Sequence, residues 1–530
     1  MTSSTWDELV SSALLGTERR TPPAPPRPGQ DAAAALLDAA AVQTVQRRAA
    51  LLPGTAGARP APAPRDPRPP LPPAARQRLA LLLADRAAGG GRHGASPDLT
   101  ELLPQWFEAA NGHGYRAPEI LLPALLETAR ARSDLRTHAL ALAGPRGQWL
   151  ARLNPQWRYA LRCGGTGAGA VAAGSSPVAV ERVWEEGLFA ERAAVLTSVR
   201  RQDPAAAQAL LSGTWDRERA EDRLMFLDCL REGLSPADEP FLERALDDRS
   251  RNVRALAAEL LSALPGSALA ARMAERARGC VALDRTGGAG PRVVVEAPPE
   301  CDAGMRRDGV VPRPPSGRGE RSWWLTQLVE AAPLGIWCER LGVASAAAAV
   351  ALPVADGWQP DLHAAWCRAA VRQRDAEWSR ALLGPATEPP TPEGSSWKDP
   401  ARLLSALDPQ ERAAWVAEFV AAHGLSDAFR LLGVCAVPWA RPLGRAVVDA
   451  LDIARDAGSY PWSFSGVMGL AERCLDPAEA DRLTPLTTLA GDPEDPYAAP
   501  GAPGYWSEAF QRLVATLRLR ATMRDELIPG

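Results

Sequence analysis

The sequence predicts an all-α protein, an α-solenoid of helical hairpins with a small irregular insertion that contains a β-hairpin. The first observation is a pattern that recurs at a spacing of 31 residues, beginning at Trp184, Trp215 and Leu246. In each copy an arginine follows the large apolar residue at the same distance and begins an apolar run. Repeats of this length form solenoids, because a single unit cannot bury its apolar face without neighbours.

Two further observations favour the same fold class. Within the repeats, apolar residues recur at helical spacing, as in residues 207–215, where they share one face. The chain has 530 residues, of which 46% are hydrophobic and 23% are charged. These are globular values, and the length suits a continuous repeat array or about two to four domains.

The N-terminal segment, residues 1–52, is expected to contain two helices. The first spans 4–16, starts with serine and threonine residues that can cap it, and ends at Gly16. The second spans about 31–52. Residues 53–75 are rich in proline, which cannot donate a backbone hydrogen bond, and they predict an extended linker or surface strap.

Three helical sections are expected after this linker. Helical repeats occupy 76–162, and a glycine-rich stretch at 163–177 interrupts the array. The regular repeats follow over 178–278, and C-terminal helical repeats occupy 322–530. The last helix carries apolar residues on one face between 506 and 517.

Residues 235–273 resemble a HEAT repeat. Asp248 stands in the turn between two helical patterns, and Val253 with Arg254 opens the second pattern, as in the HEAT family. The resemblance implies that the solenoid is HEAT-like.

The composition changes between residues 279 and 321. Two β-branched runs, CVALDR and RVVVEA, are bounded by glycine and proline and predict a short hairpin, after which no helical period remains. Insertions in solenoids often lie on the binding face, and arginine and tryptophan are enriched at binding hot spots. We therefore expect partner contact from the insertion and from the turn after the first helix, at Gly16, Thr17, Arg19, Arg306, Arg307, Asp308, Arg318, Trp323 and Trp324. Two alternatives stay open for the insertion: a solvated loop with weak surface ion pairs, and contact with nucleic acid.

The periodic tryptophans and arginines allow two interpretations. HEAT-like folds include DNA glycosylases, in which such residues could stack on bases and contact phosphates. The third copy, however, has Leu246 in the place of tryptophan, which a packing position tolerates and an indole-specific contact would not. We therefore favour a packing role, with the arginines paired to turn carboxylates of adjoining repeats.

Several classes of chemistry are disfavoured, and no cofactor or metal site is expected. Lys398 is the only lysine, and it lacks the preceding glycines of a phosphate-binding P-loop. His363 and Cys367 lie one helical turn apart, but no second pair supplies the other ligands of a tetrahedral metal site. The glycines near residue 165 lack the strand that precedes a dinucleotide-binding loop.

Charge and hydropathy predict a cytoplasmic protein. The formal net charge of −3 gives no global sign of a nucleic-acid binder or of a protein that binds anionic membranes. The eight cysteines form no C-x-x-C pair and are expected to be reduced thiols. We expect neither a secretory signal nor a membrane-spanning helix, because no run of about 18 apolar residues occurs.

Two stretches resemble a further family. They are LVSSALLGTERR near the N-terminus and PPECDAGMRRDG followed by GERSWWLTQLVEAAPLGIW. They are similar to sequences of a bacterial family of HEAT-like helical proteins of comparable length. Its genes neighbour those of MoxR-type AAA+ ATPases, von Willebrand factor A domain proteins and SWIM zinc-finger proteins. The resemblance implies a helical scaffold that works beside an ATPase.

We therefore expect binding rather than catalysis. The first hypothesis is a scaffold or adaptor that holds a protein partner, such as a MoxR-type ATPase or a von Willebrand factor A domain protein. The alternative is a HEAT-like nucleic-acid-binding protein or DNA glycosylase-like enzyme, whose binding would weaken steeply with salt. A third hypothesis is a hydrolase whose catalytic residues are assembled only by the fold.

Overall fold

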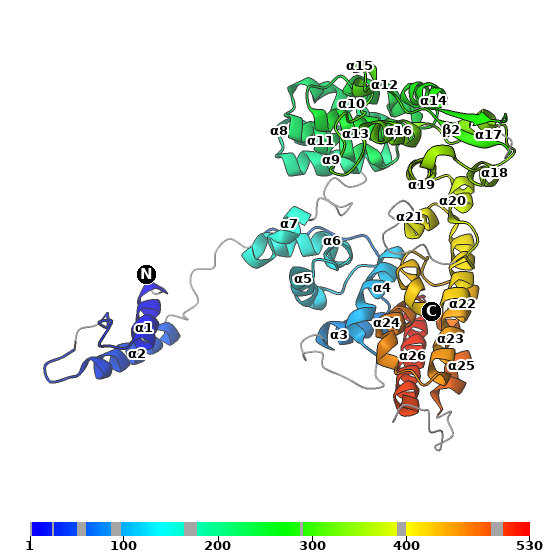
Figure 1. Ribbon diagram of the computed structural model, residues 1–530. Coiled ribbons are helices and arrows are strands. Elements are labelled where there is room, and N and C mark those ends of the chain that lie inside the picture. The colour runs from blue at the N-terminus through cyan, green and yellow to red at the C-terminus, as the bar shows by residue number, and fades with distance from the viewer. Residues whose placement is uncertain are drawn as a thin grey trace. The chain divides into compact units, whose positions relative to one another are not determined.

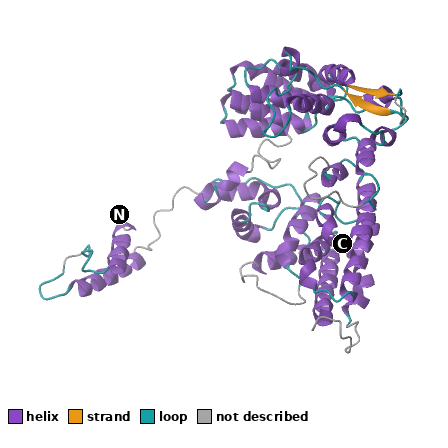
Figure 2. Ribbon diagram, viewed as in Figure 1, coloured by secondary structure: helices purple, strands orange, loops and turns teal. Residues whose placement is uncertain are grey.

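The computed structural model describes residues 3–23, 26–49, 60–85, 97–163, 177–286, 290–388, 399–488 and 502–529. These residues form helices joined by loops, with a single two-stranded sheet (Figures 1 and 2). The all-α prediction is confirmed. The chain divides into two compact units, Met1–Ala63 and Pro64–Gly530. The finer domain boundaries that the sequence predicts stay predictions. In the described ranges, every helix is too short or too polar to cross a lipid bilayer.

The first unit is a pair of helices, α1 (Ser3–Leu15) and α2 (Ala32–Ala49). Leu9 and Ala35 are its buried apolar residues, and the Arg47 guanidinium lies 4.8 Å from the centre of the Trp6 ring. Gly16 ends α1 with a φ of 84°, a left-handed conformation that glycine adopts without steric cost. Both helices lie where the sequence predicts them, and residues 50–52 of the second prediction lie outside the described residues.

The second unit begins with a small helical core. Its helices are α3 (Pro73–Asp85), α4 (Leu99–Gly112), α5 (Leu122–Ala131), α6 (Arg136–Leu153) and α7 (Tyr159–Cys163). Met523 and Leu527, from the other end of this unit, are buried in the same core. The Tyr115 hydroxyl donates to the Leu527 carbonyl at 2.8 Å. The core therefore joins segments that are far apart in the sequence.

Part of the segment expected as a linker packs against this core and forms hydrogen bonds with it. Arg68 donates to the Ala141 carbonyl at 2.7 Å and pairs with Asp66, which is 7% exposed. Leu71 is buried as well, and α3 begins at Pro73. Residues 53–59 of the expected linker lie outside the described residues.

The regular repeats form the next helices. They are α8 (Pro177–Glu186), α9 (Phe189–Gln202), α10 (Pro204–Thr214), α11 (Ala220–Asp228), α12 (Glu239–Ala245), α13 (Arg251–Ser262) and α14 (Ala268–Cys280). Helix α11 contacts both α9 and α13. The Asp203 side chain accepts from the Ala206 amide at 3.0 Å and caps α10, as the Asp-Pro pair predicts.

The periodic tryptophans and arginines pack against each other inside the repeats. Trp184 is 2% exposed, and the Arg192 guanidinium lies 4.5 Å from its ring centre. Arg192 also pairs with Glu218 of the following repeat. This geometry supports the packing interpretation, because the repeat arginine stacks on the tryptophan with the face of its guanidinium and pairs with a carboxylate through its N–H groups. The second copy repeats the arrangement with Trp215, Arg223 and Asp248.

Trp215→Ala is expected to lower the free energy of unfolding by about 2 kcal/mol, because the half-buried indole packs edge-on against Phe241 at 4.9 Å. The measurement is urea denaturation followed by circular dichroism. Trp462, which is 56% exposed, provides the control, and Trp462→Ala should change the midpoint little. Equal effects of the two substitutions would contradict the packing role.

A fully buried ion pair joins two segments of the regular repeats. Arg200 on α9 and Asp238, which directly precedes α12, are each 1% exposed, and Arg200 Nη2 lies 2.6 Å from Asp238 Oδ2. The remaining donors of Arg200 reach backbone carbonyls, including that of Glu232 at 2.8 Å. The guanidinium is therefore hydrogen-bonded on all sides without water.

The expected hairpin is present in the insertion. Strands β1 (Val281–Asp284) and β2 (Arg292–Val295) pair antiparallel, with Val281 opposite Val295 (Figure 2). The irregular segment after it contains one short helix that the sequence did not predict, α15 (Ala303–Arg307). The Asp302 side chain caps α15 by accepting from the Met305 amide at 2.7 Å, and Met305 is buried.

The remaining helices pack both against sequence neighbours and against helices further along the chain. They are α16 (Glu320–Ala331), α17 (Ile336–Leu341), α18 (Ala346–Val350), α19 (Gln359–Gln373), α20 (Ala376–Leu383), α21 (Pro400–Ser405), α22 (Pro409–Leu432), α23 (Arg441–Asp456), α24 (Ser465–Cys474), α25 (Ala480–Leu483) and α26 (Ala502–Asp525). On α26, the apolar face expected between Trp506 and Leu517 is buried.

Candidate partner-binding site

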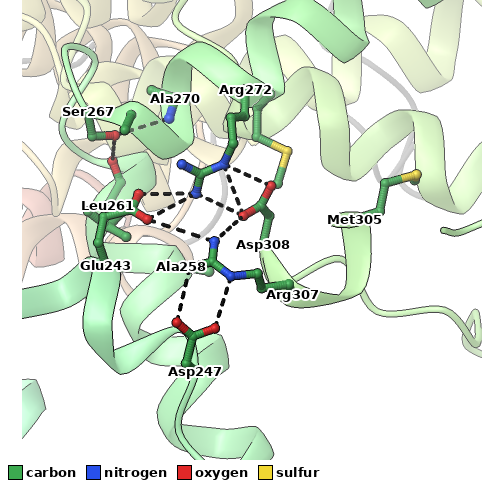
Figure 3. A network of polar contacts seen from close by, with 12 residues as sticks. Glu243, Asp247, Ala258, Leu261, Ser267, Ala270, Arg272, Met305, Arg307 and Asp308 are labelled. Carbon is green, nitrogen blue, oxygen red and sulfur yellow. Dashed lines mark hydrogen bonds and ion pairs between the residues drawn. The ribbon is translucent and has the colours of Figure 1, made fainter. Parts of the chain in front are cut away.

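The insertion is fastened to the regular repeats by a buried carboxylate. Asp308 follows α15 and is 2% exposed (Figure 3). It accepts from Arg272 Nη2 at 2.8 Å and from Arg276 Nη1 at 2.6 Å, and both arginines lie on α14. Arg272 also pairs with Glu243 of α12 at 3.1 Å. Helix α14 thus holds Asp308 of the insertion directly, and Glu243 of α12 holds one of the two arginines that bind it.

The charge state of Asp308 is set by these arginines. Burial alone would raise the pKa of this carboxyl, but hydrogen bonds from Arg272 and Arg276 outweigh burial and hold the pKa below its ordinary value. The carboxylate is therefore ionised at neutral pH and neutralises the neighbouring guanidinium groups.

The backbone of the insertion also lies close to α13. Gly309 has a φ of 93°, and a Cβ built on it would lie 2.4 Å from the Cβ of Ala258. Only glycine combines this conformation with so close an approach. The position of the insertion on the array is thus fixed by backbone packing as well as by ion pairs (Figure 3).

The neighbouring arginines of the insertion differ in their contacts. Arg307 pairs with Asp247 at 2.9 Å, in the turn after α12, although the Arg307 side chain stays 43% exposed. Arg306 is exposed, and among the described residues its side chain donates to the carbonyl of Asp302 alone, at 3.2 Å. Of these two expected site residues, Arg306 has the guanidinium that is freer to contact a partner.

Trp323 and Trp324, the expected site residues just after the insertion, form hydrogen bonds that position the loop of the insertion. The indole N–H groups of Trp323 and Trp324 each donate at 2.8 Å to a carbonyl of the insertion, those of Val311 and Pro312. Trp324 is 8% exposed, and Arg318 lies 5.6 Å from the centre of the Trp323 ring. These contacts give both tryptophans a structural role in positioning the loop.

The remaining expected site residues, Gly16, Thr17 and Arg19, belong to the separate first unit. Thr17 is half-buried and Arg19 is exposed. Next to them, Leu14 is 82% and Leu15 is 54% exposed. Exposed apolar side chains beside a turn are typical of protein-contact sites.

A charged cavity of about 1110 Å³ lies in the second unit, lined by residues from α13, α16, α19 and α21 among other segments. The described lining includes arginines and carboxylates in similar number: Arg231, Arg368, Arg372, Arg374 and Arg402 with Glu232, Glu259, Glu330 and Asp399. Sequence reasoning missed this cavity, because its residues come from segments that are far apart in the chain, from Arg231 to Leu403.

The carboxylates of this cavity are held by arginines. Glu330 accepts from both Arg368 and Arg372, and Glu259 pairs with Arg231 at 2.9 Å. These pairs place groups of both charges around the cavity, an arrangement that suits recognition of charged groups.

The histidine and thiol considered for a metal site are packed in the core. His363 is 4% exposed and stacks on Trp366 with ring centres 5.5 Å apart, and Cys367 is 5% exposed. Within the described ranges, no group of three or more histidine, cysteine, aspartate or glutamate side chains is placed to hold a metal ion.

Some residues of the site were missed but left a signal in the sequence. Arg272 and Arg276 are spaced one helical turn apart, which places both side chains on one face of α14. Such a pair predicts an acidic partner, although only the fold identifies Asp308 as that partner.

The fold and site define a large all-α protein with an inserted hairpin. The chain belongs to a family described as a family of unknown function (DUF5691), whose model matches residues 8–527. No curated protein and no solved structure matches the chain.

Proposed function

We propose that this protein is a cytoplasmic bacterial scaffold, a HEAT-like α-solenoid that binds a protein partner without catalysing a reaction. The observation that carries the proposal is the cavity that presents both arginines and carboxylates. A polypeptide offers groups of both charges to such a surface, whereas nucleic acid requires a predominantly basic one.

Two other surfaces support the proposal. The insertion is fixed on the array through Asp308, so the exposed Arg306 is presented from a rigid base. The exposed Leu14 and Leu15 of the first unit add an apolar contact beside Gly16. Rigid presentation lowers the entropy cost of binding.

We propose a MoxR-type AAA+ ATPase or a von Willebrand factor A domain protein as the partner. This part of the proposal is supported by the resemblance of the N-terminal stretch and of the segment around Trp323 to a family encoded near such proteins. The cavity then receives a charged segment of that partner.

The test is binding of the full chain to each purified candidate partner from the same genome, measured by isothermal titration calorimetry. Arg402 lines the cavity and its side chain is 75% exposed, so Arg402→Glu should weaken binding about tenfold through like-charge repulsion and lost pairing. Arg441 lies outside the cavity lining and is 71% exposed, and Arg441→Glu is the matched control.

Binding that responds equally to both substitutions would place the contact elsewhere than the cavity. If neither candidate binds, the named partners are wrong. Salt-sensitive binding of duplex DNA by the wild-type chain would favour the nucleic-acid alternative instead.

A further inference from the structure

A second cavity, of about 500 Å³, lies where α4 meets α26 and the segment around Val437 and Pro438. Leu102 of α4 and Met523 and Leu527 from the C-terminal region form apolar parts of its wall. The size is within the range of cavities that bind small molecules.

Arg520 lines this cavity and is 4% exposed. Its Nη1 donates to the carbonyls of Leu475 at 2.6 Å and Glu472 at 3.1 Å, at the C-terminal end of α24. Its Nη2 is buried and has no hydrogen-bond partner among the described residues. Arg520 also forms no ion pair with a described carboxylate, in contrast to the buried Arg200.

Arg520 therefore lacks a hydrogen-bonded counter-ion among the described residues, although Asp476 acts on it electrostatically and Glu108 lines the same cavity. Burial, reinforced by the neighbouring positive charge of Arg524, lowers the pKa of Arg520 to about 10. The group is still protonated at neutral pH. A buried cation without an anion is unfavourable, so this position favours any ligand that supplies a negative charge.

Trp106 supplies a second unused donor in the same cavity wall. The side chain is 2% exposed, and its Nε1 is buried with no acceptor among the described residues. Most buried polar groups in proteins are hydrogen-bonded, so two unsatisfied donors in one wall point to a missing acceptor. Arg524, which also lines the cavity, adds a second positive charge.

We propose that this cavity binds a small organic anion, whose carboxylate or phosphate oxygens accept from Arg520 Nη2 and Trp106 Nε1. Its short apolar body lies against Leu102 and Met523. Both nitrogens are shielded from water in this structure, so side chains of the wall must move to admit the ligand. Because the site is shielded, each hydrogen bond to the anion is stronger than in water.

The experiment uses the full chain and measures binding by calorimetry with three probes of similar shape: benzoate, phenyl phosphate and neutral benzamide. We expect one of the two anions to bind at one site per chain and benzamide to bind at least tenfold more weakly. Comparison of the two anions identifies whether the site prefers a carboxylate or a phosphate.

Trp106→Phe removes the N–H donor and keeps an aromatic ring, and it should weaken anion binding about tenfold. Trp337→Phe is the matched control, because Trp337 is a fully buried indole outside this cavity, and its Nε1 also has no partner in the described part of the chain. Arg520→Gln should abolish binding, and the Trp106 variant remains informative if that chain fails to fold. Equal binding of benzoate and benzamide, or no binding of either anion at millimolar concentration, would overturn the proposal.

Discussion

Asp238→Ala is expected to lower the free energy of unfolding by about 3 to 5 kcal/mol, because it leaves the guanidinium of Arg200 buried without its counter-ion. Both side chains are almost inaccessible to water, so solvent cannot replace the carboxylate. Asp238 also accepts from the Ser235 amide at 3.0 Å, which caps the short turn Pro236–Asp238. The substitution removes this hydrogen bond too.

Urea denaturation of the full chain measures this effect, and the m-value shows whether the transition stays cooperative. Asp228→Ala is the control, since Asp228 pairs with Arg231 at the surface, where both side chains are about half exposed. The control should cost less than about 1 kcal/mol. Similar midpoints for the two variants would show that Arg200 finds other partners.

Asp308→Ala is expected to cost about 2 to 3 kcal/mol and to loosen the insertion from the array. The cost is smaller than for Asp238, because Arg272 and Arg276 are about one quarter to one third exposed and regain water. Hydrogen–deuterium exchange should become faster in residues 303–311, while α9 and α11 keep their protection.

Asp247→Ala is the matched control for the Asp308 variant. Asp247 pairs with Arg307 in the same network, but its side chain is 63% exposed, so its removal should change exchange little. Equal loosening by both substitutions would contradict the central role of Asp308.

The Asp308 pair also predicts a pH dependence. Because the folded pKa of Asp308 is lowered, its contribution to stability is fully present above the ordinary value of 3.8. The contribution is lost as the pH falls from there through the lowered folded pKa. Wild type should therefore lose more stability than Asp308→Ala as the pH falls below 3.8.

Local features of the fold could be predicted from the sequence. Asp203 before Pro204 marks the start of α10, because capping and a fixed proline φ act within a few residues. The β-branched runs on both sides of a glycine-rich turn likewise mark the hairpin of β1 and β2. The spacing of Trp184 and Trp215 reveals the repeat, since each copy uses the same packing position.

The partners of buried charges could not be predicted in this way. Arg200 and Asp238 are 38 residues apart, and Arg272 and Asp308 are 36 apart, so no helical or strand period connects them. Separation in the sequence also explains why the contacts of Trp323 and Trp324 could not be predicted. Composition indicates a binding hot spot, but only the fold shows that both indole N–H groups are used by the insertion itself.

Burial of Met523 and Leu527 in the core of α3 to α6 sets an order for folding in the cell. These four helices emerge from the ribosome long before α26 is translated, so their apolar core stays open during synthesis of the intervening repeats. An incomplete core of this kind is prone to aggregate and is a substrate for chaperones. The first core of the second unit is therefore completed only after translation of α26.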